Sequence, residues 1–130
     1  MTPKPLRLDH LSLYVSDLER AESFYVDILG LERVMRLPDQ ALLSLGEVNI
    51  GLMLGKPPPP EPDVLDRPFG RAHHAFRIEA EAVQAWRQRL SAAAVPTSAV
   101  IDWGDHECFY FLDPDGNLLE FVTPPQPDSR

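Results

Sequence analysis

The chain alternates strand-like segments with two segments of helical periodicity. Apolar residues recur at helical spacing over residues 18–30 and 79–95. Alternating or continuous apolar runs typical of strands occur at 8–15, 41–46, 48–54, 71–78, 108–112 and 118–122. Each half of the chain therefore opens with a strand, continues with a helix and ends with further strands. This order predicts two βαβββ modules and the α+β fold class.

A proline-rich stretch separates the two modules. We place module 1 at about residues 6–54, the connector at 55–69, module 2 at about 70–124 and a tail at 125–130. Proline fixes φ and lacks an N–H donor, so we expect a stiff, extended connector. A single module exposes one apolar sheet face, so the two modules together form a single domain of residues 1–130.

Local signals mark the start of the first helix. Ser16 and Glu19 have the spacing of a capping box, in which each side chain accepts a hydrogen bond from the backbone N–H of the other residue. Gly30 follows the last apolar residue of the same segment and is a plausible helix end.

Each module opens on a strand that contains histidine. Val15, at the end of the first strand, is five positions beyond His10, and Ile78 is five positions beyond His73. Neighbouring residues of a strand point to opposite faces, so His73 and the adjacent His74 cannot share one face. We therefore treat His10 and His73 as equivalent, place them on the face opposite the helix, and give His74 no ligand role.

Glu120 lies within an otherwise apolar strand, where an unpaired carboxylate would be costly. Two imidazoles and one carboxylate suit a divalent transition metal and leave coordination positions open. We expect His10, His73 and Glu120 to bind such an ion, and Fe²⁺, Mn²⁺, Zn²⁺, Ni²⁺ and Co²⁺ all accept these ligands. The structural alternative is a packed histidine in each strand and a Glu120 paired with Arg77.

Charge and composition narrow the class of partner. The 130 residues have a net charge of −8, which argues against binding to nucleic acid or to an anionic membrane surface. The single cysteine, Cys108, excludes an internal disulfide, and no apolar run has the length of a signal peptide core or a membrane span. We expect a cytoplasmic protein whose partner is a small-molecule substrate.

Three stretches, "DHLSLYVSDLERAESFYVDILGLE", "HHAFRI" and "FYFLDPDGNLLEF", resemble the vicinal oxygen chelate superfamily. This superfamily includes glyoxalase I, extradiol dioxygenases, fosfomycin-resistance enzymes and bleomycin-resistance proteins, and the resemblance covers about residues 6–124. It implies a cup-shaped, curved mixed sheet with helices outside, and a homodimer. The metal ligands that it implies fall on His10, His73 and Glu120.

The chain departs from two members of that superfamily. The fourth metal-binding position of glyoxalase I falls in residues 48–54, where only Asn49 could coordinate, which argues against glyoxalase I activity. Extradiol dioxygenases have an additional acid–base histidine, for which His106 is the candidate here. His106 lies closer to Phe109 than their pattern requires, and its surroundings are also typical of a solvated turn.

The fosfomycin-resistance enzymes match in some positions and not in others. Ser12 takes the place of their pocket hydroxyl, and Tyr110 that of their pocket tyrosine. Their anion-binding lysine falls near the apolar Val100, and their arginine near Ser129, beside Arg130. A phosphonate normally recruits such cations, so this type of transferase is the less favoured reading.

Taken together, the residues predict a metal-dependent enzyme in which Tyr110 and Ser12 bind substrate oxygens. Dioxygenase, lyase and transferase chemistry all remain open. The alternative is a metal-free binding protein of the bleomycin-resistance type, but such proteins usually lack the ligand residues that this chain keeps. Further candidates for lining the cup are Tyr14, Leu52, Met53 and Trp103.

Overall fold

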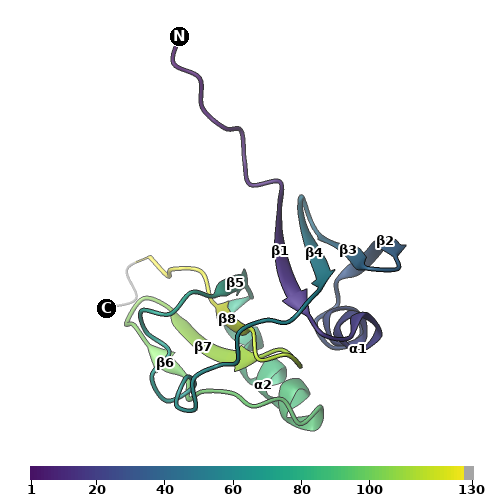
Figure 1. Cartoon of the computed structure of the whole chain (residues 1–130). Coiled ribbons are helices and arrows are strands. Elements are labelled where there is room, and N and C mark those ends of the chain that lie inside the picture. Colours follow the sequence, from purple (N-terminus) through teal and green to yellow (C-terminus); the bar gives the residue numbers. More distant parts are fainter. Residues whose placement is uncertain (128–130) are drawn as a thin grey trace. The chain divides into compact units, whose positions relative to one another are not determined.

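The computed structural model describes residues 1–127, and the chain divides into two compact units between Pro58 and Pro59. Each unit contains one four-stranded mixed sheet and one helical segment in the order β-α-β-β-β (Figure 1). The two βαβββ modules and the α+β class are thus confirmed. The division falls within the predicted connector, and residues from Pro59 onward belong to the C-terminal unit. Within residues 1–127, no helix is long and apolar enough to cross a membrane.

The sheet of the N-terminal unit has the strand order β1-β4-β3-β2. Strand β1 runs parallel to β4, whereas β3 is antiparallel to both β4 and β2. A π-helical turn, η1, continues the helix α1. The elements are β1 (His10–Val15), α1 (Leu18–Ser23), η1 (Phe24–Ile28), β2 (Glu32–Leu37), β3 (Gln40–Leu45) and β4 (Val48–Leu54).

The helix α1 begins one residue later than its sequence signal indicated. Asp17 is the N-cap, and its side chain accepts a hydrogen bond from the Arg20 backbone N–H at 3.0 Å. The predicted capping box of Ser16 and Glu19 is therefore wrong, because the aspartate oxygen satisfies the free N–H instead. Gly30 adopts a positive φ of 90° at the end of the helical segment, as expected for a helix stop. The buried apolar side chains of this segment are Leu18, Ala21, Phe24, Tyr25 and Leu29.

The sheet of the C-terminal unit repeats the same topology, with the order β5-β8-β7-β6 and β5 parallel to β8. Strand β5 is shorter than residues 71–78, so His73 immediately precedes it. Strands β2 and β6 were not located from the sequence. The elements are β5 (His74–Arg77), η2 (Ala80–Ala82), α2 (Val83–Ala92), β6 (Ile101–Asp102), β7 (Glu107–Leu112) and β8 (Leu118–Val122).

One face of this second sheet packs on α2 through aromatic rings. The ring of Phe121 lies 4.7 Å from that of Trp86 on the helix and 4.6 Å from that of Phe111. Phe76 of β5 belongs to the same layer, with its ring 6.1 Å from Phe121. His74, two residues before Phe76, shares this parity, and burial lowers its pKa, as does the neighbouring His73. The helix-facing role that alternation predicted for His74 is therefore consistent with its environment.

The opposite face of the second sheet is partly covered by residues 59–71, which we call the strap. Val64 of the strap is buried against the side chains of Cys108, Tyr110 and Leu118. A Cβ added to Gly116 would lie 2.6 Å from Cδ of Pro60, so the strap also approaches the β7–β8 turn closely.

The strap is not the extended spacer that its prolines suggested. Its middle forms a turn in which the Val64 N–H donates to the Glu61 carbonyl, and the Asp66 and Arg67 N–H groups donate to the Asp63 carbonyl. The prediction of an extended connector is wrong for this part, because a buried valine and these hydrogen bonds fold it back on the sheet.

Cys108 is buried under the strap, at 2% exposure. Burial raises the pKa of its thiol to about 11, and the nearby Glu120 carboxylate acts in the same direction, while a hydrogen bond from Trp103 opposes both. The folded protein therefore holds the proton of this thiol more strongly than the unfolded chain does.

This linkage predicts a loss of stability at alkaline pH. A pKa raised from 9.0 to about 11 stabilises the folded state fully below pH 9, and this contribution disappears as pH rises toward 11. The measurement is urea denaturation at pH 8 and at pH 11. Between these pH values the free energy of unfolding should decrease in both proteins, and the decrease should be about 1 to 3 kcal/mol smaller in Cys108→Ala than in the unsubstituted protein. Equal losses in the two proteins would contradict the burial of this thiol.

Candidate functional site

His73 and Glu120 form the centre of the candidate site in the C-terminal unit. Nε2 of His73 lies 2.9 Å from Oε1 of Glu120, although 46 residues of chain separate them. Glu120 is buried in the middle of β8, opposite Tyr110 of β7 and Ala75 of β5. The strand register therefore brings together an imidazole and a carboxylate that the sequence had placed in one site.

Each of the two candidate histidine ligands has its Nδ1 engaged by an oxygen. Nδ1 of His73 lies 2.7 Å from the Arg71 carbonyl, and Nδ1 of His10 lies 2.9 Å from the Asp9 carboxylate. Metal-binding histidines almost always have such an outer partner, which fixes the tautomer and leaves Nε2 as the ligand atom. The donor atoms and their outer partners thus fit a divalent transition metal.

Tyr110 packs against His73 of this pair and against Val64 of the strap. Its ring packs edge-on against the ring of His73, with centroids 5.3 Å apart. Burial raises the pKa of Tyr110 to about 12, and the negative charge of Glu120 contributes to the rise. The phenol therefore keeps its proton near neutral pH and can serve as a hydrogen-bond donor but not as a base.

His10 and Ser12 lie on one face of β1 in the N-terminal unit. Their exposed side chains alternate with the inward residues Leu13 and Val15, as the pattern predicted. In the parallel register, Ser12 is opposite Gly51 of β4.

The repeat places Gly51 at the position that Glu120 occupies in the second module. Ser12 is two residues beyond His10 and opposite Gly51, whereas Ala75 is two residues beyond His73 and opposite Glu120. Asn49, the only residue of this stretch whose side chain could coordinate a metal, is opposite His10 instead. A Cβ on Gly51 would lie 3.0 Å from Oγ of Ser12, so the serine hydroxyl occupies the space of the missing side chain.

His106 lies outside the His73–Glu120 pair, in the turn between β6 and β7. Nδ1 of His106 is 2.7 Å from the Asp105 carboxylate, and its ring stacks on Trp103 with centroids 6.3 Å apart. The sequence allowed either an acid–base histidine or a solvated turn residue. The half-buried side chain and these contacts describe a turn residue with defined partners, and a catalytic role for His106 stays a prediction.

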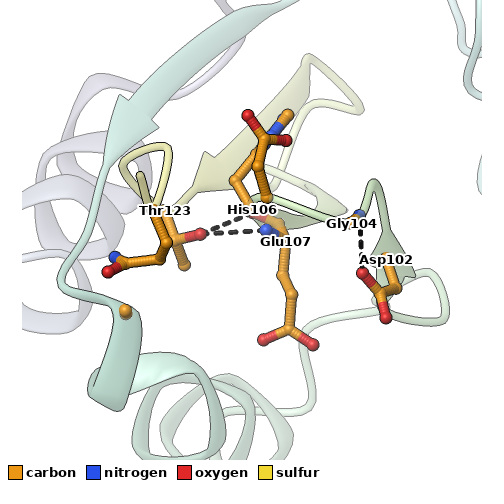
Figure 2. Close-up of a pocket in the computed structure, with 8 residues that line it drawn as sticks. Asp102, Gly104, His106, Glu107 and Thr123 are labelled. Atoms are coloured by element: carbon orange, nitrogen blue, oxygen red, sulfur yellow. Dashed lines mark hydrogen bonds and ion pairs between the residues drawn. The ribbon is translucent and has the colours of Figure 1, made fainter. Parts of the chain in front are cut away.

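An open pocket of about 250 Å³ adjoins His106 (Figure 2). Its rim is held by hydrogen bonds from the Glu107 N–H to Thr123 Oγ1 and from the Gly104 N–H to the Asp102 carboxylate. The pocket is lined by Ala80, Asp102, Gly104, Asp105, His106, Glu107, Thr123 and Gln126. It includes no atom of the His73–Glu120 pair, so it is a separate, acidic feature.

Two residues near the pair were not identified from the sequence. The exposed ring of Phe69 lies 6.4 Å from that of Tyr110 and 5.8 Å from that of Trp103. Arg71 supplies the carbonyl that contacts His73. Both belong to the strap, which the sequence presented as a spacer. The sequence did offer one signal for Arg71. It lies two residues before the candidate ligand His73 and ten residues after Glu61, the first acidic residue of the strap.

The remaining predicted residues have mixed outcomes. Leu52 is fully buried and cannot line a cup, whereas Tyr14 and Trp103 are exposed and Met53 is partly exposed. Ser129 and Arg130 lie outside the described residues. Among residues 1–127, and within each unit taken by itself, no three or more His, Cys, Asp or Glu side chains are arranged so that they could hold a metal ion together. The joint ligation by His10, His73 and Glu120 therefore stays a prediction.

Comparison with known proteins assigns the family. The chain is 35% identical over 117 residues to glutathione transferase FosA of Serratia marcescens. The aligned region covers 87% of this chain and 77% of the relative. It is 31% identical over 118 residues to metallothiol transferase FosB of Staphylococcus epidermidis, with coverage of 89% and 80%.

A solved structure, the fosfomycin resistance protein FosX of Listeria monocytogenes, has the same fold, with a TM-score of 0.79. Its sequence identity is 23%, over 98% of this chain and 99% of FosX. A family model described as the Glyoxalase/Bleomycin resistance protein/Dioxygenase superfamily matches residues 7–121. The chain therefore belongs to the glyoxalase/bleomycin resistance protein/dioxygenase superfamily.

Proposed function

We propose that this protein is a divalent-metal-dependent enzyme acting on a small substrate that presents oxygen atoms to the metal. The proposal depends on one observation, the 2.9 Å contact between His73 Nε2 and the buried Glu120 carboxylate. A carboxylate buried in an apolar strand needs a compensating partner, and a cation shared with imidazole ligands provides one.

His73 and Glu120 would hold the ion from the C-terminal unit, and His10 would complete the ligand set. We propose that His10 comes from the N-terminal unit of the same chain or of a second copy in the expected homodimer. When bound, the ion supplies Lewis acidity to substrate oxygens. The outer contacts of both histidines, to Arg71 and to Asp9, support this assignment because they leave Nε2 as the ligand atom.

The protein's own hydroxyl groups would orient the substrate. Tyr110 keeps its proton because its pKa is raised to about 12, so it can donate a hydrogen bond to a substrate oxygen. Ser12, beside Gly51, is exposed on the His10 face and would donate a second. The exposed rings of Phe69 and Trp103 would contact apolar parts of the substrate.

A pair of neighbouring histidine variants tests the metal site. We expect the protein to bind about one Mn²⁺ or Zn²⁺ per chain, and His73→Ala to weaken this binding at least tenfold because a ligand is lost. His74→Ala removes the same group one position away on the helix-facing side and should leave the affinity within about twofold. Titration calorimetry of protein purified without added metal provides the measurement.

Two results would contradict the metal proposal. One is equal binding by the His73→Ala and His74→Ala variants, and the other is no binding by the unsubstituted protein. Thermal denaturation separates the alternative class: an ion at one hundred times its Kd adds about 2.7 kcal/mol of stability. Stabilisation by organic ligands and by none of the divalent ions would identify a binding protein instead.

A second candidate reaction is thiol transfer, which the similarity to the glutathione and metallothiol transferases favours. The anion-binding lysine of fosfomycin-resistance enzymes would fall near Val100, which is apolar, and this argues against a phosphonate substrate.

The direct test of thiol transfer is consumption of glutathione in the presence of fosfomycin and Mn²⁺. We expect no consumption above that of the His73→Ala variant, because the cationic partner for a phosphonate is missing at Val100. Consumption that requires His73, Mn²⁺ and fosfomycin together would instead assign the protein to this transferase class.

A further inference from the structure

The side chain of Arg71 closes the strap on itself. Its Nη1 forms an ion pair with Glu61, and its Nη2 lies 3.4 Å from Oδ1 of Asp63. Its Nε donates a hydrogen bond to the Arg67 carbonyl at 2.7 Å. Only 23% of the side chain is exposed, so this guanidinium is held by three groups of the strap rather than by solvent.

The backbone carbonyl of Arg71 meets the candidate metal ligand. It lies 2.7 Å from Nδ1 of His73. A carbonyl can only accept a hydrogen bond, so Nδ1 carries the proton and donates it. The other ring nitrogen, Nε2, then points toward Glu120 at 2.9 Å. The ring orientation of His73 is thus set from both sides.

The strap is also seated on the sheet by contacts that do not involve Arg71. Val64 is buried against Cys108 and Tyr110, and Pro60 fits against the turn at Gly116, where a Cβ would clash with it. The groups that hold the Arg71 guanidinium are therefore themselves fixed on the sheet that contains Glu120. A displacement of Arg71 relative to His73 would have to break these contacts.

We propose that Arg71 is a positioning residue that fastens its own carbonyl to Nδ1 of His73 and so presents Nε2 to the metal. This inference rests on the proposed function, since Nε2 is the atom that would bind the ion. The side chain acts through the strap, and the carbonyl acts on the ring. Without the side-chain contacts, the carbonyl is still present but is no longer held beside the imidazole.

The first experiment observes the Nδ1 proton of His73 in metal-free protein by ¹H–¹⁵N spectroscopy. A proton hydrogen-bonded to a carbonyl gives a protected signal, assigned by its loss in His73→Ala. We expect the signal in the unsubstituted protein and its loss through exchange in Arg71→Ala. Arg67→Ala is the matched control and should keep the signal. The Arg67 side chain is 81% exposed, and its contact with Asp63 is long, at 3.9 Å.

A second variant tests the same contacts in case Arg71→Ala does not fold. The double variant Glu61→Gln, Asp63→Asn leaves Arg71 in place and neutralises two of its three partners. It should lose the same protected signal while circular dichroism shows the fold retained. A merely structural strap contact would not change the signal of one imidazole proton in a folded protein.

The second experiment titrates Mn²⁺ into the same set of proteins. Loss of an outer partner of a metal-binding histidine weakens affinity by about tenfold to a hundredfold. We expect this loss in Arg71→Ala and in the double variant, and a change of less than about twofold in Arg67→Ala.

The two experiments separate the inference from the function on which it rests. A protected signal that persists in Arg71→Ala, that is lost equally in Arg67→Ala, or that is absent from the unsubstituted protein would overturn the role of Arg71. Absence of Mn²⁺ binding by the unsubstituted protein would overturn the metal proposal, and the proton signal would still decide whether Arg71 orients His73.

Discussion

The second sheet and the candidate site both depend on a carboxylate placed inside an apolar strand. Glu120 occupies the middle of β8, where its neighbours along the strand, Leu119 and Phe121, are buried. A carboxylate in such a place is destabilising unless a cation or a protonated group faces it, and removing one partner of a buried pair typically costs about 3–5 kcal/mol. The structure places Nε2 of His73 2.9 Å from this carboxylate, and an ion shared by the two groups would supply the positive charge. The stability of the sheet and the chemistry of the site are therefore connected through the same two side chains.

The two modules share a topology but differ in their chemistry. Both have a parallel pair formed by the first and last strands, and both begin near a histidine with an oxygen partner on Nδ1. The second module has Glu120 at the position where the first has Gly51. Without a second acidic residue, the first module offers an imidazole and the hydroxyl of Ser12. This difference between the modules is consistent with the ligand set that we propose, two histidines and one carboxylate rather than four groups.

Periodicity was sufficient to predict the modules but not their details. Apolar runs bounded by turns predict strands at residues 48–54 and 118–122, and these are the bounds of β4 and β8. Strand β2 was not located, since all six of its residues are exposed and its charged and apolar residues follow no clear alternation. The capping box was wrong because Asp17 rather than Ser16 is the N-cap, and its carboxylate accepts from the Arg20 N–H.

The candidate site was predictable where strand register decided it. Five-residue spacing aligned His73 with His10, and the structure brings His73 to Glu120. The strap was not predictable in this way, because a proline-rich segment has no periodicity that would indicate its packing on the sheet. Arg71 and Phe69 belong to that segment, so the contacts they make became visible only from the fold.

The most direct test of the account is anomalous diffraction from crystals of the zinc- or manganese-loaded protein. An ion bound as proposed gives a single peak per site at about 2.0–2.2 Å from imidazole nitrogens of His10 and His73 and from the carboxylate of Glu120. A peak coordinated by other residues, such as the acidic groups around His106, or the absence of any peak at these three side chains, would contradict it.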